Sequence, residues 1–331
     1  MRFRHALVVG KFAPLHAGHQ FLIETALSEA DHVTVLCYSN PDFAEMPDAV
    51  RAAWIGELYP RVTVRIPLCP PLNSERDEVH WEYLKNWLRA ERLDIDTVFS
   101  SESYGAPFAR TLGSDVGHRM VDKARTKIAV SGTRIRQDIH SHRSWLDPRV
   151  YRHFVKRVVF MGAESSGKST LAEHAARDFD TVFVPEIGRL VWEAKAGALS
   201  VGDYLDIARA HRTAEDAAIL KANRYVFSDT NAITTLLLGF CYGHIRQAPE
   251  ELVELARLCK TRYSDTFICE DDFPFSQDGW RDDAAWRSRI QGMIRYDLQM
   301  REISSVSLYG PVEQRLQTVR SALLLVISQN Q

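Results

Sequence analysis

The chain has 331 residues, of which 45% are hydrophobic and 25% charged, and its formal net charge is −2. These values are ordinary for globular proteins, and they exclude a disordered chain and a strongly basic nucleic-acid-binding protein. The length exceeds the ~100–200 residues of a typical domain, so we expect two domains. The five cysteines form no Cys-x-x-Cys pair, which argues against a zinc site. No apolar run approaches a signal peptide or a membrane span, so a cytoplasmic protein without membrane insertion is expected.

Short β-branched runs alternate with amphipathic segments in the first half of the chain, as in a parallel sheet covered by helices. The pattern predicts strands at 6–9, 33–38, 62–67 and 97–100, and helices at 18–30, 48–58 and 78–89. In the third of these helices Trp81, Leu84, Trp87 and Leu88 recur at three- and four-residue spacing. The first half is therefore expected to form a Rossmann-like α/β domain.

The pattern becomes polar and basic around Pro148 and restarts with an apolar strand at 157–161. This change predicts a domain boundary near residue 155, with one domain at 1–155 and the other at 156–331. The second domain is expected to contain further strands at 181–184, 225–228 and 266–269, and helices at 201–222, 230–242, 248–261 and 283–301. This order predicts a second parallel α/β domain with the layout of a P-loop kinase.

Residues 162–169 read Gly-Ala-Glu-Ser-Ser-Gly-Lys-Ser, a complete phosphate loop between a strand and a helix. In such loops the backbone amides surround the phosphates, the lysine reaches the β- and γ-phosphates, and the hydroxyl ligates Mg²⁺. We predict these roles for Lys168 and Ser169. The other residues expected to bind ATP are Gly162, Ala163, Glu164, Ser165, Ser166, Gly167 and Thr170.

Two acidic residues follow predicted strands of the second domain, where α/β sheets bind ligands. Asp229 is expected to act toward Mg²⁺ or the acceptor hydroxyl, and the alternative is that it caps the next helix. Glu186 is a candidate general base or ribose-hydroxyl ligand. The segment 271–282 mixes acids, aromatics and glycine, as a lid does, and Arg281 could close over the transferring phosphoryl group. A solvated turn is the alternative for this segment.

Residues 10–19 read Gly-Lys-Phe-Ala-Pro-Leu-His-Ala-Gly-His and follow the first strand. Backbone amides at a helix start favour anions, and imidazoles donate hydrogen bonds to phosphate oxygens, so His16 and His19 are expected to face one phosphate. Such a site suits attack of one phosphate on the α-phosphorus of ATP. Gly10, Lys11 and Phe12 are further nucleotide-binding candidates, although Lys11 could be a solvated lysine. The sequence leaves open whether Arg51 and Trp54 contact substrate or pack a helix.

This stretch resembles the H-x-G-H signature of the nucleotidylyltransferase superfamily. Residues 130–136, Val-Ser-Gly-Thr-Arg-Ile-Arg, resemble the second motif of that superfamily, which opens a helix and holds the ATP phosphates. The resemblance implies that Arg136 contacts the β- and γ-phosphates and that Ser131, Gly132 and Thr133 line the same nucleotide.

The two domains, with Ser-Ser-Glu-x-Tyr-Gly at 100–105 and Asp-x-Pro-Phe-x-Gln-Asp-Gly-x-Arg at 272–281, resemble the NadR-type bifunctional proteins over nearly the whole chain. These proteins join a nicotinamide-mononucleotide (NMN) adenylyltransferase to a ribosylnicotinamide kinase. The resemblance implies that ATP and Mg²⁺ support phosphorylation of nicotinamide riboside to NMN, and then adenylyl transfer that yields NAD and pyrophosphate. Small molecules rather than nucleic acids would be the partners, and a homo-oligomer is compatible with the sequence.

Some members of this family begin with a helix-turn-helix repressor segment, whereas this chain reaches its first strand by Ala6, which argues against a repressor role. Phe275 and Trp280 are aromatic candidates for contact with the pyridine ring.

Two other functions fit parts of the pattern. A coenzyme A synthase fusion would also join an H-x-G-H adenylyltransferase to a P-loop kinase, but Glu186 and the Asp-Gly-x-Arg segment look like nucleoside-kinase features. A nucleotide-sensing regulator would bind NAD or ATP with little catalysis, yet it would not need Lys168, His16 and His19 together.

Overall fold

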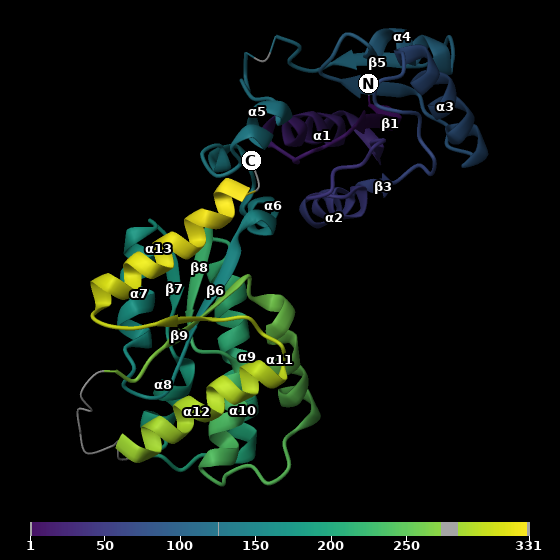
Figure 1. Cartoon of the computed structure of the whole chain (residues 1–331). Coiled ribbons are helices and arrows are strands. Elements are labelled where there is room, and N and C mark those ends of the chain that lie inside the picture. The colour runs from purple at the N-terminus through teal and green to yellow at the C-terminus, as the bar shows by residue number, and fades with distance from the viewer. Residues whose placement is uncertain (1, 125, 273–283, 330–331) are drawn as a thin grey trace. The chain divides into compact units, whose positions relative to one another are not determined.

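The computed structural model describes residues 2–124, 126–272 and 284–329. The chain divides into two compact units, Met1–His153 and Phe154–Gln331, close to the boundary placed on the sequence. The described part of each unit contains a five-stranded parallel sheet with helices packed on it (Figure 1). The expected fold class, two parallel α/β domains, is therefore confirmed.

In the first unit the sheet has the strand order β3-β2-β1-β4-β5, so β1 is central. Ala6, Leu7 and Val8 of β1 are completely buried. The loop that follows β1 therefore opens at the middle of the sheet, at the carboxyl ends of its strands. The strands and helices of this unit are β1 (Phe3–Gly10), α1 (Ala17–Glu29), β2 (Ala30–Cys37), α2 (Asp48–Leu58), β3 (Thr63–Arg65), α3 (Asp77–Ala90), β4 (Thr97–Ser100), α4 (Gly105–Leu112), β5 (Gly117–Met120), α5 (Gly132–Gln137) and α6 (Pro148–Tyr151).

In the second unit the order is β10-β9-β6-β8-β7, and β6 is central. Alternate residues of β6 enter different cores, because side chains of a strand point to opposite faces. Val158 and Phe160 pack in the core formed with α7 and α13, whereas Val159 and Met161 pack with α9, α10, α11 and α12. The elements are β6 (Lys156–Met161), α7 (Lys168–Asp178), β7 (Val182–Val184), α8 (Ile187–Ala194), α9 (Val201–Ala218), β8 (Tyr225–Asp229), α10 (Ala232–Cys241), α11 (Glu250–Arg262), β9 (Asp265–Cys269), α12 (Ala284–Met300), β10 (Val306–Leu308) and α13 (Val312–Gln329).

Several elements were missed by the sequence pattern. The edge strands β5 and β10 are short and partly exposed, so they lack the continuous apolar run by which buried parallel strands are recognised. The helices α4, α8 and α13 were also not predicted, and the predicted helix 201–222 ends at Ala218. In the described ranges, no helix is both long and apolar enough to cross a membrane.

Candidate nucleotide-binding sites

The loop after β1 is fixed by a buried arginine. Arg51 on α2 has no exposed surface, and its guanidinium donates to the carbonyl of Lys11 and, at 2.9 Å, to that of Met46. The same guanidinium forms an ion pair with Asp42. Trp54, one turn further along α2, is 4% exposed. Both residues are therefore packed into the domain.

His16 ends this loop and caps α1. Its Nδ1 accepts hydrogen bonds from the backbone amides of Gly18, at 3.1 Å, and His19, at 3.4 Å. Because Nδ1 accepts, the neutral ring carries its proton on Nε2, which makes that nitrogen a hydrogen-bond donor. The ring of His19 stacks on that of His16, with centroids 3.7 Å apart. The two imidazoles thus form one stacked pair at the amino end of α1.

The second motif of the first unit lies against the loop after β1. A Cβ atom at Gly132 would lie 2.9 Å from the carbonyl oxygen of Ala13, so α5 approaches the loop as closely as glycine permits. The Arg136 guanidinium donates to the Ala13 carbonyl and, at 3.1 Å, to the Thr133 hydroxyl. The Ser131 hydroxyl accepts from the amide of Arg134 at 3.3 Å and caps α5. The structure therefore brings the two motifs together.

Positive charge is concentrated at this junction. Partial burial, followed by the charge of Arg136, lowers the pKa of Lys11, and Arg51 acts in the same direction. Glu102 opposes the shift. Lys11 is only partly exposed, and the charges of Arg136 and Arg51 act on it. Such a concentration of positive charge favours an anionic ligand.

The Ser-Ser-Glu-x-Tyr-Gly stretch forms a packed turn after β4. The Ser100 hydroxyl lies 2.9 Å from Nε2 of His118 on β5, and the Tyr104 hydroxyl donates to the Val9 carbonyl at 3.1 Å. A Cβ atom at Gly105 would lie 2.0 Å from Oγ of Ser100, so a side chain does not fit there. This turn connects β4 with β5 and with the end of β1.

The phosphate loop of the second unit depends on two glycines. Gly162 has φ +147°, and a Cβ atom there would lie 2.5 Å from the carbonyl oxygen of Cys269. Gly167 is left-handed, with φ +83°, and stands immediately before α7. Lys168, the first residue of α7, is 7% exposed, and its Nζ donates to the Ala163 carbonyl at 2.9 Å. The backbone geometry thus requires glycine at both positions.

Two acids stand at the carboxyl ends of the neighbouring strands β7 and β8. Asp229, at the end of β8, is fully buried, and neither of its carboxylate oxygens has a hydrogen-bond partner within the described residues. Burial raises the pKa of Glu186, which precedes α8, while the charge of Lys168 lowers it and that of Asp229 raises it. Asn231 caps α10 by accepting from the amide of Ile233 at 3.0 Å, so Asp229 is not the cap. Unsatisfied buried carboxylate oxygens are characteristic of functional sites.

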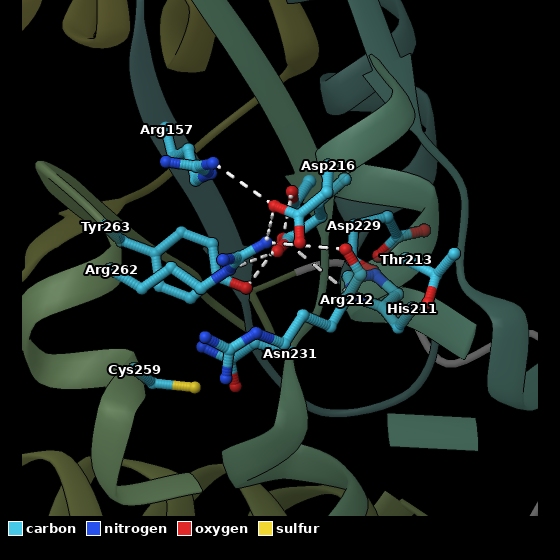
Figure 2. A network of polar contacts seen from close by, with 12 residues as sticks. Arg157, His211, Arg212, Thr213, Asp216, Asp229, Asn231, Cys259, Arg262 and Tyr263 are labelled. Carbon is cyan, nitrogen blue, oxygen red and sulfur yellow. Dashed lines mark hydrogen bonds and ion pairs between the residues drawn. The ribbon is translucent and has the colours of Figure 1, made fainter. Parts of the chain in front are cut away.

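A buried polar network holds the end of β8 (Figure 2). Glu215 on α9 is 1% exposed and accepts from the Ser228 hydroxyl at 2.6 Å and from Nε of Arg262 at 2.7 Å. Burial lowers the pKa of His211, which favours the neutral ring. Nε2 of His211 lies 3.3 Å from the Asp229 carbonyl oxygen. The network therefore fixes the backbone that carries Asp229.

Two polar residues of the phosphate-loop surroundings were not predicted from the sequence. Gln291 on α12 accepts from the Ala163 amide at 2.8 Å, and Arg315 on α13 donates to the Ser166 carbonyl at 2.8 Å. Both are buried. Gln291 lies beside Ile294, and Arg315 lies beside Val319, on the buried sides of their helices. A polar residue at a buried helix position is the sequence signal that could have revealed them as candidates.

Aromatic side chains adjoin the phosphate loop. The Tyr242 hydroxyl donates to the Glu164 carboxylate at 3.0 Å, and the ring centroids of Tyr242 and Trp286 are 5.7 Å apart. Neither aromatic was predicted as a site residue. The candidates Phe275, Trp280 and Arg281 lie outside the described residues.

The chain is similar to proteins of known sequence and structure. Residues 157–315 match a protein-family model described as an AAA domain. The curated "Trifunctional NAD biosynthesis/regulator protein NadR" of Escherichia coli (strain K12) and that of Salmonella typhimurium (strain LT2) are each 28% identical over 296 residues, which cover 83% of this chain and 71% of the relative.

Two crystal structures of NadR share the fold. One, in complex with NR, has a TM-score of 0.68 at 21% identity, and the other, with NAD and AMP-PNP, has a TM-score of 0.64 at 22% identity. Each alignment covers 97% of this chain and 95% of the other. The resemblance indicated by the motifs is therefore confirmed, and the chain is NadR-like across both of its domains.

Proposed function

We propose that the protein is a bifunctional enzyme of NAD salvage. The second domain phosphorylates nicotinamide riboside to NMN with ATP, and the first transfers the AMP moiety of a second ATP to NMN, which yields NAD and pyrophosphate. The observation that carries the proposal is that both central strands, β1 and β6, end in loops that present groups suited to phosphates. The similarity to NadR supports this choice of substrates over other phosphorylated compounds.

In the kinase reaction an acceptor hydroxyl of the riboside attacks the γ-phosphorus, and its proton passes to a carboxylate. Glu186 suits this role because burial raises its pKa and makes it a better proton acceptor when ionised. Lys168 and the loop amides stabilise the negative charge of the transferred group. Because these groups act by position and charge, no covalent enzyme intermediate is required.

The same site fits Mg²⁺. Magnesium is usually bound through one or two carboxylates and the substrate phosphates, and it neutralises charge on the β- and γ-phosphate oxygens. The unsatisfied carboxylate oxygens of Asp229 and the exposed hydroxyl of Ser169 are the donors that would hold it. Among the described residues, no group of three or more His, Cys, Asp or Glu side chains is placed to hold a metal ion.

In the adenylyl transfer the phosphate of NMN attacks the α-phosphorus of ATP and pyrophosphate leaves. His16 donates a hydrogen bond from Nε2 to a phosphate oxygen, since its Nδ1 already accepts a hydrogen bond from the amide of Gly18. Arg136 and Lys11 add positive charge beside the same loop. Fixed donors of this kind stabilise the charge that grows on the phosphate oxygens in the transition state.

The pyridine ring of the riboside needs an aromatic surface near the phosphate loop. Tyr242 and Trp286 provide one, because Tyr242 is bonded to Glu164 of the loop itself. Their rings can stack on a flat heterocycle. We therefore include this pair in the riboside site.

Separate assays of the two half-reactions test the proposal. The protein is incubated with ATP and Mg²⁺ and either nicotinamide riboside or NMN, and the formation of NMN or NAD is followed. Phosphopantetheine and dephospho-coenzyme A serve as competing substrates, and turnover of these alone would replace the proposal with a coenzyme A synthase. Tight NAD binding without any turnover would instead indicate a nucleotide sensor.

A further inference from the structure

Arg315 is a buried cation that neither proposed reaction uses. It lies on α13 with 1% of its surface exposed, on the helix side that packs Leu316 and Val319 into the core. Burial of a guanidinium is unfavourable unless its N–H groups are bonded and its charge is balanced. The partners of Arg315 therefore reveal its role.

These partners come from the ends of three adjacent strands. Nη1 donates to the carbonyl of Ser166 in the phosphate loop at 2.8 Å. Nη2 donates to the carbonyl of Glu270, after β9, at 2.9 Å, and Nε donates to that of Gly310, after β10, at 2.8 Å. The Asp272 carboxylate pairs with the guanidinium and also accepts from the Gly310 amide at 2.6 Å. One side chain thus connects the phosphate loop with the two neighbouring strand ends.

The bond to Ser166 sets the direction of the next amide. In a trans peptide the C=O of one residue and the N–H of the following residue point in opposite directions. Since the Ser166 carbonyl points to Arg315, the Gly167 N–H points away from Arg315. Gly167 stands at the amino end of α7, where backbone amides attract phosphate.

We propose that Arg315 is a positioning residue for ATP, which holds the Gly167 amide in the direction needed to bind a phosphate oxygen. The proposal rests on the proposed use of this loop for ATP. Gln291 orients a peptide at the other end of the loop by binding its amide: Oε1 accepts from the Ala163 amide at 2.8 Å, and Nε2 donates to the Cys269 carbonyl at 3.1 Å. The two helices after β9 therefore each supply one buried side chain that orients a peptide of the loop.

Arg315→Lys tests this role, because lysine keeps the charge but lacks the planar fork that reaches three carbonyls. The KM for ATP is expected to rise about tenfold or more, as for loss of a bond to a charged phosphate. The value of kcat and the KM for nicotinamide riboside should change little, because the amide contacts ATP equally in the ground and transition states. Arg320→Lys on the same helix is the control, since Arg320 pairs at the surface with Asp178 and Glu313.

A spectroscopic readout separates positioning from general destabilisation. With 15N-glycine labelling, the Gly167 amide signal of the unaltered chain is expected to shift when ADP and Mg²⁺ are added, and to shift less in Arg315→Lys. An unchanged signal response and an unchanged KM for ATP in a folded Arg315→Lys protein would overturn the proposal.

Asp272→Asn covers the case in which Arg315→Lys does not fold. It keeps Arg315 but removes the carboxylate charge that anchors it, so a smaller increase in the KM for ATP is expected. No increase in this variant would also reject the proposal. If the unaltered chain binds ADP but phosphorylates no nicotinamide riboside, the proposed reaction is wrong, and the amide signal still tests Arg315.

Discussion

The loops after β1 and β6 occupy the same place in their sheets but present different groups. At the first loop the proposed donors are side chains, namely His16, Lys11 and Arg136, and the last of these comes from a distant segment that packs on Ala13. At the second loop the glycines Gly162 and Gly167 let the backbone itself face the ligand. The donors at the first loop are therefore assembled by tertiary packing, whereas the glycines and Lys168 of the second loop lie within one stretch of chain.

If the two sites work independently, removing the main cation of one site should leave the activity of the other site unchanged. Lys168→Ala is expected to lower the rate of NMN formation from nicotinamide riboside by about 1,000-fold, at the upper end of the effect of one transition-state donor. Adenylyl transfer from supplied NMN should remain within about twofold of the unaltered chain, a bound we base on the separate folding cores. Loss of both activities in a folded protein would contradict the two-site comparison.

The acidic side of the pH–rate profile of the kinase reaction tests the role of Glu186. Burial raises the pKa of Glu186, so the kinase rate should increase with pH through a midpoint above that of an ordinary glutamate, because only the ionised carboxylate accepts a proton. Glu186→Gln is expected to remove this limb and to lower kcat about 100-fold. The pH profile of adenylyl transfer is the internal control and should be unchanged.

The same shift has a consequence for stability. A carboxyl whose pKa is higher in the folded state holds its proton more tightly there than in the unfolded chain. Glu186 therefore stabilises the second unit at acidic pH, and this contribution is lost as pH rises through the folded pKa. In Glu186→Gln, chemical denaturation across this range should show a smaller decrease in stability with pH. An identical pH dependence in both proteins would mean that partial burial and the charge of Asp229 do not raise the pKa of Glu186.

At the first site, two substitutions of His16 separate helix capping from catalysis. Asparagine is a good helix cap and can accept hydrogen bonds from the backbone amides of α1, but it places no donor at the position of the His16 Nε2. We expect His16→Asn to reduce adenylyl transfer roughly 10–100-fold with little loss of stability. His16→Ala should lose the same activity and also about 1 kcal/mol of stability. Equal melting temperatures for the two variants would show that the cap is unimportant.

The different ways in which the two loops are built also explain what the sequence could predict. The phosphate loop was recognised whole, because its glycines, Lys168 and flanking elements are contiguous. The first site required two separate motifs and a resemblance to a family. Gln291 and Arg315 were missed, because nothing local shows that a buried side chain on α12 or α13 reaches a loop more than 100 residues earlier.

The fold class was predicted correctly, but some edge strands were missed for a related reason. The central strands β1 and β6 are buried on both faces and so carry continuous apolar runs, whereas the edge strand β5 reads Gly-His-Arg-Met and was not recognised. The assignment of Asp229 as a cap or a site residue was also undecidable from sequence, because Asn231 lies close by and is an equally good cap.

The smallest expected effects test whether the two units unfold separately. A Cβ atom added at Gly56 in α2 or at Gly292 in α12 would have no neighbouring atom within 4 Å, so alanine fits at either site. Each substitution should stabilise its own unit by about 0.5–1 kcal/mol through improved helix propensity. In scanning calorimetry, Gly56→Ala should raise the melting temperature of the first unit only, and Gly292→Ala that of the second unit only.

Gly105→Ala is the opposite control and should lower the melting temperature of the first unit, because its Cβ would lie 2.0 Å from Oγ of Ser100. A shift of both transitions by any one substitution would show that the two sites belong to a single cooperative structure.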